Sequence, residues 1–165
     1  MRVLGIDPGL LCTGYAYLDV PNPASLDGIT IVESGCFVFR KNASIPSRLL
    51  ELEHDLRELI DRLNPGIACV ETLFAHPAYP KAALTVAHAR GVALMTLQRF
   101  GVEIEELPPA EIKRALTGSG RASKQQMQRS AAALLKLPAI PEPADVADAM
   151  AIALAGARRS NITTA

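Results

Sequence analysis

The sequence predicts an α/β fold built on a five-stranded mixed sheet, with the first three strands antiparallel and helices on its flanks. Two observations carry this prediction. Three strand-like segments separated by turn residues come first, and helical segments then alternate with two further short apolar runs. The chain has 165 residues, which suits one well-filled core and is too short for two ordinary domains. We therefore expect residues 1–165 to form a single domain.

The opening strands come from short apolar runs. The first run ends on Asp7, and Pro8 and Gly9 follow it directly as turn residues. The segment Tyr15–Leu18 is expected to pair back on the first strand, and Thr30–Arg40 alternates well enough to form the third. Three antiparallel strands in succession are the simplest arrangement.

The middle of the chain alternates between helix and strand. Apolar residues recur at helical spacing over Ser47–Leu63, with acids on the opposite side, which predicts an amphipathic helix. The continuous apolar run Ile67–Glu71 is typical of a buried central strand. The helix expected over Ala82–Phe100 is apolar nearly all round, and Ala87 and Gly91 share one face. It is either fully buried or packed against a second subunit.

The last third of the chain predicts one more strand and three helices. The fifth strand lies in "GVEIEELPP" and ends at Pro108. A short helix over Ala110–Leu116 follows. Ser123 opens the next helix, and Gln126 three residues later completes a capping-box pattern. The final helix is expected from about Ala144 to Arg159.

Composition and charge exclude several classes of protein. The chain is 49% hydrophobic and 21% charged, close to the average for globular proteins, so disordered and collagen-like classes are excluded. Its net charge is zero and its pI is about 6.8, which by itself does not indicate a polyanionic partner. Residues 111–136, however, contain six basic side chains and one acid. Such a segment suits phosphate contact, although a solvated helix face looks similar.

Cysteine usage and hydropathy point to a reducing compartment. Cys12, Cys36 and Cys69 are odd in number, far apart and set in apolar runs, so we expect free core thiols. The N-terminus lacks the apolar region of a signal peptide, and no run approaches the ~20 apolar residues that cross a bilayer. We expect a cytoplasmic protein without membrane association.

Carboxylates stand at the ends of several predicted elements. Asp7 ends the first strand and Glu71 the fourth, while Asp145 and Asp148 lie three residues apart at the start of the last helix, on one face. Each has an ordinary interpretation, because Asp before Pro-Gly is common turn chemistry and acids stabilise a helix N-terminus. Together, the four could converge on one rim of the sheet.

A cluster of carboxylates predicts a particular chemistry. Like charges repel unless a cation neutralises them, and oxygen ligands suit Mg²⁺ or Mn²⁺ better than zinc. Two such ions about 4 Å apart can activate water and stabilise the leaving oxygen of a phosphodiester. The acids therefore predict metal-assisted hydrolysis of nucleic acid.

Five motifs together resemble a known family. They are "LGIDPG", "TGY", "VETLF", "EIKRALTGSGRASKQQMQ" and "LPAIPEPADVADAMAIA", and they cover essentially the full chain. This ordered set resembles RuvC, the family of bacterial Holliday-junction resolvases in the ribonuclease-H-like superfamily. The resemblance implies a ribonuclease-H-like endodeoxyribonuclease that cuts four-way junctions by symmetric paired nicks in recombination and repair. It also implies a homodimer that works with the branch-migration proteins RuvA and RuvB.

The resemblance also assigns roles to individual residues. Asp7, Glu71, Asp145 and Asp148 match the family's catalytic metal ligands, with two Mg²⁺ or Mn²⁺ ions per site. The third of these positions holds His in some members and Asp here. Phe74 matches an aromatic that engages bases at the junction centre, although core packing would explain it equally well. Lys113 and Lys124 match functional lysines near the DNA backbone, and the same basic segment adds two further candidates for DNA contact, Arg114 and Arg121.

Other functions are compatible with parts of this pattern. A related nuclease of the same superfamily could act on other branched nucleic acids. An actin-like phosphotransferase or ATPase also opens on an "IDxG" strand and turn, but it needs two such domains around its nucleotide. A third alternative is a module that binds branched DNA through the basic segment without cutting it.

Overall fold

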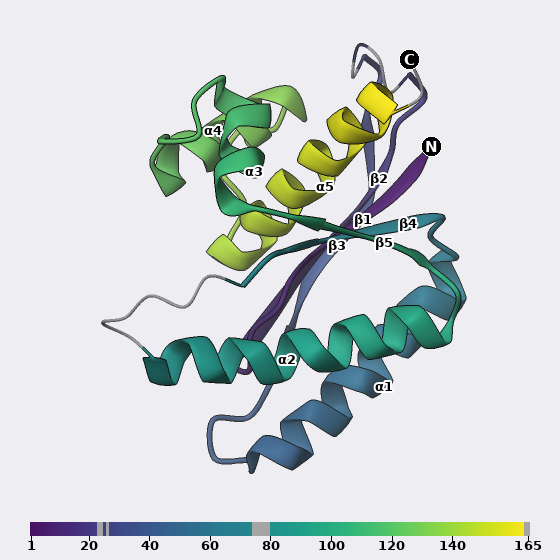
Figure 1. Ribbon diagram of the computed structural model, residues 1–165, viewed down its shortest axis with the longest axis vertical. Coiled ribbons are helices and arrows are strands. Elements are labelled where there is room, and N and C mark those ends of the chain that lie inside the picture. The colour runs from purple at the N-terminus through teal and green to yellow at the C-terminus, as the bar shows by residue number, and fades with distance from the viewer. Residues whose placement is uncertain (23–24, 26, 74–79, 164–165) are drawn as a thin grey trace.

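The computed structural model describes residues 1–22, 25, 27–73 and 80–163, and it has a five-stranded sheet between two helical layers (Figure 1). The strands are β1 (Arg2–Asp7), β2 (Cys12–Asp19), β3 (Thr30–Val38), β4 (Ile67–Glu71) and β5 (Glu103–Leu107). Their order across the sheet is β3-β2-β1-β4-β5. The first three strands are antiparallel, and β4 runs parallel to β1 and β5. The predicted mixed sheet is confirmed.

The helices are α1 (Ile45–Leu63), α2 (Pro80–Arg99), α3 (Pro109–Thr117), α4 (Lys124–Leu134) and α5 (Ala144–Thr163). Helix α1 begins two residues before the predicted Ser47, because the Ser44 side chain caps it by accepting a hydrogen bond from the Ser47 N–H, and a proline fits its first turn. It ends where Asn64 takes the left-handed conformation at φ 45°. In Figure 1, α1 and α2 lie on one side of the sheet, and α5, with α3 and α4 beyond it, on the other.

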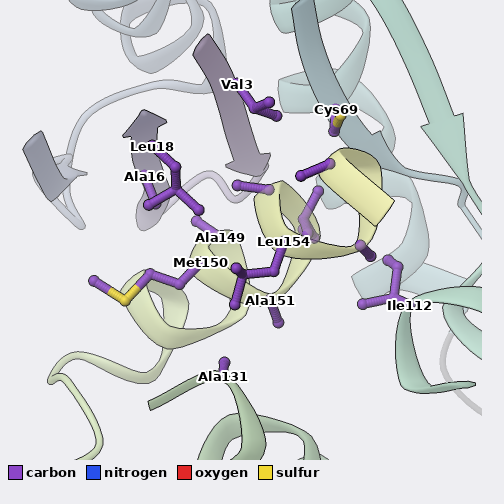
Figure 2. Packing of buried hydrophobic residues seen from close by; sticks show 14 of the residues in the cluster. Val3, Ala16, Leu18, Cys69, Ile112, Ala131, Ala149, Met150, Ala151 and Leu154 are labelled. Atoms are coloured by element: carbon purple, nitrogen blue, oxygen red, sulfur yellow. The ribbon is translucent and has the colours of Figure 1, made fainter. Parts of the chain in front are cut away.

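Alternation along the strands divides the core between the two faces. On β1, Leu4 and Ile6 belong to the cluster that packs against α1 and α2. Val3 belongs to the cluster built around α5 (Figure 2). This two-sided burial follows from the period of two in a β-strand. It leaves the ends of the central strands as the places where polar side chains can collect.

Helix α5 packs very closely on the sheet because its core positions are mostly alanine. A side-chain carbon added at Gly5 of β1 would overlap the α5 backbone at Ala149 and Ala153. At the other end of the contact, one added at Gly156 of α5 would overlap Cys69 of β4. The absence of a side chain at both glycines allows helix and sheet to approach closely. The position of α5 on the sheet is therefore tightly fixed.

Helix α2 is buried on one face only. Ala89, Ala93 and Leu97 are fully buried, whereas Leu84 and Met95 are 62% and 47% exposed. The fully buried alternative for this helix is therefore wrong. No helix in the described ranges is both long and apolar enough to cross a membrane.

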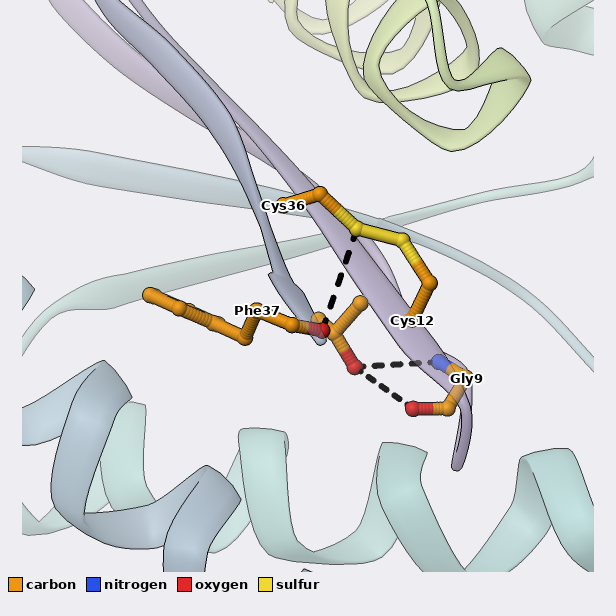
Figure 3. The surroundings of a disulfide bond; sticks show 5 residues. Gly9, Cys12, Cys36 and Phe37 are labelled. Atoms are coloured by element: carbon orange, nitrogen blue, oxygen red, sulfur yellow. Dashed lines mark hydrogen bonds between the residues drawn. A yellow bond between two sulfur atoms is a disulfide. The ribbon is translucent and has the colours of Figure 1, made fainter. Parts of the chain in front are cut away.

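Two of the three cysteines differ from the prediction. Cys12 and Cys36 form a disulfide with Cα atoms 6.0 Å apart (Figure 3), whereas Cys69 is free and buried as expected. The prediction of three free thiols failed because it used separation along the chain. The antiparallel pairing of β2 with β3 sets Gly14 opposite Cys36 and Cys12 opposite Val38, so the two cysteines become diagonal neighbours.

Candidate active site

Asp7 is the last residue of β1, and the turn that follows holds it at the sheet end. The buried hydroxyl of Thr13 donates to the Gly9 carbonyl (2.7 Å) and accepts from the Gly9 N–H (3.1 Å), as Figure 3 shows at Gly9. A side chain at Gly14 would overlap the backbone carbonyl of Asp145, so β2 and the start of α5 touch here. The turn therefore fixes the Asp7 backbone and brings the first turn of α5 beside it.

Glu71 ends β4, the parallel neighbour of β1. The register sets Ile6 beside Val70, so Asp7 and Glu71 follow at adjacent strand ends. Arg90 of α2 donates from Nε to the Glu71 carbonyl at 3.0 Å and pairs with Glu106 of β5. Arg90 thus ties α2 to the ends of both β4 and β5.

The two aspartates of α5 differ in environment. Asp148 is only 7% exposed, and both of its carboxylate oxygens have partners on α4. Gln128 donates from Nε2 to Oδ1 at 2.9 Å, and Lys124 Nζ lies 2.5 Å from Oδ2. Asp145, one turn earlier, is partly exposed.

Three of the four predicted acids meet in one cavity. It has a volume of about 230 Å³ and is lined by Asp7, Glu71, Pro109, Ile112, Lys113, Lys124, Met127, Asp148 and Ile152. A second cavity of about 210 Å³ shares Asp7, Glu71 and Pro109 with the first and extends toward Arg90. Asp145 is not among the lining residues of either cavity. The negative charge of Asp145 nevertheless contributes to the raised pKa of Asp7.

Burial and the proximity of several carboxylates shift the pKa values of the residues that line the cavity. Burial, followed by the charges of Asp148, Asp145 and Glu71, raises the pKa of Asp7 from 3.8 to about 7, although Lys124 opposes the shift. Burial and then Asp148 likewise raise the pKa of Glu71, against the two lysines of the cavity. Burial alone would lower the pKa of Lys124, but its hydrogen bond to Asp148 and the surrounding acids raise it. The cavity therefore favours additional positive charge.

The donor set fits a hard divalent cation. The carboxylates offer only oxygen atoms, and their mutual repulsion is what a bound cation relieves. As the side chains stand, no three acid, His or Cys groups among the described residues enclose an ion-sized space. Lys124 Nζ instead pairs with the Oδ2 oxygen of Asp148. The residues thus have the right chemistry, with an ammonium group in their midst.

The structure separates the predicted DNA-contacting residues into two groups. Lys113 and Lys124 line the acidic cavity. Arg114 is exposed beside Arg158 and Arg159, and Arg121 is exposed in a different groove with Arg129. Phe74 lies outside the described residues.

Sequence reasoning missed two polar side chains that support the site, Arg90 and Gln128. Arg90 stands out in the sequence as a charge in the middle of an otherwise apolar helix, yet its partners are distant in the chain. Gln128 follows Lys124 by four residues, which places both on one face of a helix. That spacing was an available signal for Gln128.

Comparisons with known proteins agree with this geometry. Residues 3–156 match the family of crossover junction endodeoxyribonuclease RuvC. A relative of that name from Rhodopirellula baltica is 40% identical over 154 residues, spanning 93% of this chain and 84% of the relative. Another, from Prochlorococcus marinus, is 41% identical over 156 residues, spanning 94% and 97%.

Solved structures give the same result for the fold. A Thermus thermophilus RuvC structure superposes with a TM-score of 0.88 at 27% identity, covering 99% of this chain and 98% of that one. The T. thermophilus RuvC in complex with Holliday junction substrate superposes with a TM-score of 0.87 at 24% identity, with the same coverage. The predicted ribonuclease-H-like fold class is confirmed.

Proposed function

The chain belongs to the RuvC family of crossover junction endodeoxyribonucleases, and we propose that it resolves four-way (Holliday) DNA junctions by symmetric paired nicks in recombination and repair. One observation carries the proposal within this family. Asp7, Glu71 and Asp148 come from three separate elements and line one cavity together with two lysines. Residues 1–165 would then act as one nuclease domain.

We assign divalent-cation binding to Asp7, Glu71, Asp145 and Asp148, with Mg²⁺ or Mn²⁺ as the cation and two ions per site. Bound there, the ions would supply an activated water and neutralise charge on the phosphodiester. Asp7 and Glu71 line both cavities, which makes them the carboxylates that two ions would share. The place of Asp145 beside Gly14 favours a role at the margin of the site.

The basic residues fall into two groups, which would contact different phosphates of the DNA. Lys113 and Lys124 lie within the acidic cavity, so they suit phosphates next to the bond that is cut. Arg114 and Arg121 are exposed away from the cavity and suit backbone phosphates farther along the duplex arms. A role for Phe74 at the junction centre stays a prediction from the family motif.

A homodimer would supply the two sites that paired nicks require. One face of α2 supports it: Leu84, His88, Gly91 and Met95 recur at helical spacing, and all are exposed. Among the described residues, and leaving aside the backbone of α2 itself, nothing lies within 4 Å of a side-chain carbon added at Gly91, so this face is open to a second backbone. Cooperation with RuvA and RuvB stays a prediction from the family, and a cytoplasmic location stays a prediction from the sequence.

The function is tested with purified protein, Mg²⁺ and matched junction, fork and linear duplex substrates. We expect symmetric nicks in opposing strands of the junction, with ligatable 5′-phosphate and 3′-hydroxyl ends. Efficient cutting of plain duplex, or of forks in preference to junctions, would point instead to a related nuclease. ATP hydrolysis without DNA cleavage would favour a phosphotransferase.

A further inference from the structure

Helix α4 contributes two side chains to one buried carboxylate. Gln128 and Lys124 lie one turn apart on the helix and contact different oxygens of Asp148. The start of α4 is itself fixed by a reciprocal capping box between Ser123 and Gln126. The two contacts therefore come from a well-anchored helix.

Gln128 has the character of a fixed support. Its side chain is buried, and its Nε2 donates to Asp148 Oδ1 at 2.9 Å and lies 3.5 Å from the Ala144 carbonyl at the start of α5. A buried amide with these partners has little freedom to turn. It holds Oδ1 and leaves Oδ2 directed to the cavity side, where Lys124 meets it.

Lys124 has the character of a displaceable partner. Its side chain is 63% exposed, so only its end is engaged, with Nζ 2.5 Å from Oδ2. In the part of the chain that the structure describes, Lys124 is the one cationic group paired with Asp148. A buried carboxylate without a cation is costly, and a flexible exposed stem lets the ammonium leave when another cation arrives.

We propose that Lys124 competes with a divalent ion for Asp148 Oδ2, while Gln128 is the positioning residue that keeps Asp148 oriented for that ion. The inference rests on the metal site of the proposed function. It also connects metal loading to DNA binding, because a phosphate that attracts Lys124 frees the oxygen that the ion needs. Mn²⁺ should accordingly bind more tightly once DNA is present.

The experiment measures Mn²⁺ binding to the full chain without DNA, by calorimetry, in the wild type and four variants, of which Asp7→Asn serves to identify binding at the proposed metal site. Lys124→Met removes the competing ammonium but keeps the stem, and we expect Mn²⁺ to bind about tenfold more tightly, about 1.4 kcal/mol. Lys113→Met is the matched control, because Lys113 lines the same cavity without pairing with a described carboxylate. It should tighten binding clearly less. Gln128→Met should weaken binding by about tenfold or more, as expected for loss of an outer support.

A loss of folding would weaken Mn²⁺ binding in every variant, whereas Lys124→Met is expected to tighten it and Gln128→Met to weaken it. Circular dichroism checks the fold of each variant. The competition is wrong if Lys124→Met binds Mn²⁺ no more tightly than Lys113→Met. The positioning role is wrong if folded Gln128→Met binds Mn²⁺ as the wild type does. If wild-type protein shows no Mn²⁺ binding that Asp7→Asn abolishes, the metal site itself fails, and this inference fails with it.

Discussion

The two ends of α5 perform opposite tasks on one helix. Its first two turns carry Asp145 and Asp148 into a region where burial and like charges are unfavourable. The middle of the helix, from Ala149 to Ala157, is buried between the sheet and helices α3 and α4 (Figure 2). Burial of the apolar part stabilises the fold, and it offsets the unfavourable burial and mutual repulsion of the carboxylates at the acidic part.

The difference between the two parts of α5 explains why its apolar part packs so closely on the sheet. The overlap that any side chain at Gly5 or Gly156 would cause means that α5 can neither slide nor rise on the sheet without losing contacts. A helix fixed in this way positions Asp148 relative to Asp7 and Glu71. Precision at the charged end therefore depends on packing at the apolar end.

The largest effect is expected from neutralising the charged end. Asp7→Asn removes a proposed metal ligand but none of the basic residues, so junction cleavage should fall by about 10³-fold or more, about 4 kcal/mol, while junction binding persists. Cleavage and gel-shift assays on one preparation measure both quantities. Loss of binding in a folded variant would instead make the acids structural.

The apolar end can be broken with a single methyl group. Gly5→Ala forces a side-chain carbon into the α5 backbone and should lower the free energy of unfolding by about 3 kcal/mol. Gly66→Ala is the matched control, because the nearest atom to its added carbon is 4.0 Å away. Urea denaturation compares the two variants. Equal stabilities would refute the close packing of α5.

The charged end should also give the metal-free protein a distinctive pH dependence. With its pKa raised from 3.8 to about 7, folded Asp7 keeps a proton that the unfolded chain releases near pH 4. Stability should therefore fall as pH rises from about 4 to about 7, by up to about 1.4 kcal/mol per pH unit, since the folded state binds more protons in that window. Chelator-treated wild type and Asp7→Asn are compared by thermal unfolding across this range. Parallel curves for the two proteins would contradict the raised pKa.

The smallest effect concerns a single phosphate contact. Lys124→Ala should weaken junction binding and reduce the slope of log affinity against log salt by about one. Arg129→Ala is a useful comparison, because Arg129 lies in the same helix but in the groove with Arg121. A salt slope unchanged by Lys124→Ala would exclude a phosphate contact for Lys124.

The sequence predicted the sheet and the acids because both depend on local patterns. Apolar runs that end on Asp7 and Glu71 mark strand ends, and the three-residue spacing of Asp145 and Asp148 marks one helix face. These features survive whatever the details of tertiary packing.

Contacts between distant segments could not be predicted in the same way. Gln128 and Asp148 are twenty residues apart and meet only because α4 crosses the start of α5. The disulfide of Cys12 and Cys36 depends on strand register. The exposure of Gly91 depends on which face of α2 packs against the sheet. Periodicity shows that a helix has an apolar face, but it does not identify the residues against which this face packs.

The metal site proposed at the acidic cavity is tested most directly by a crystal structure of the protein soaked with Mn²⁺, with the ion located by its anomalous signal. An anomalous peak is expected in the cavity lined by Asp7, Glu71 and Asp148, with Lys124 displaced from Asp148. Mn²⁺ bound elsewhere, with the acids and Lys124 as they stand now, would contradict the proposed metal site.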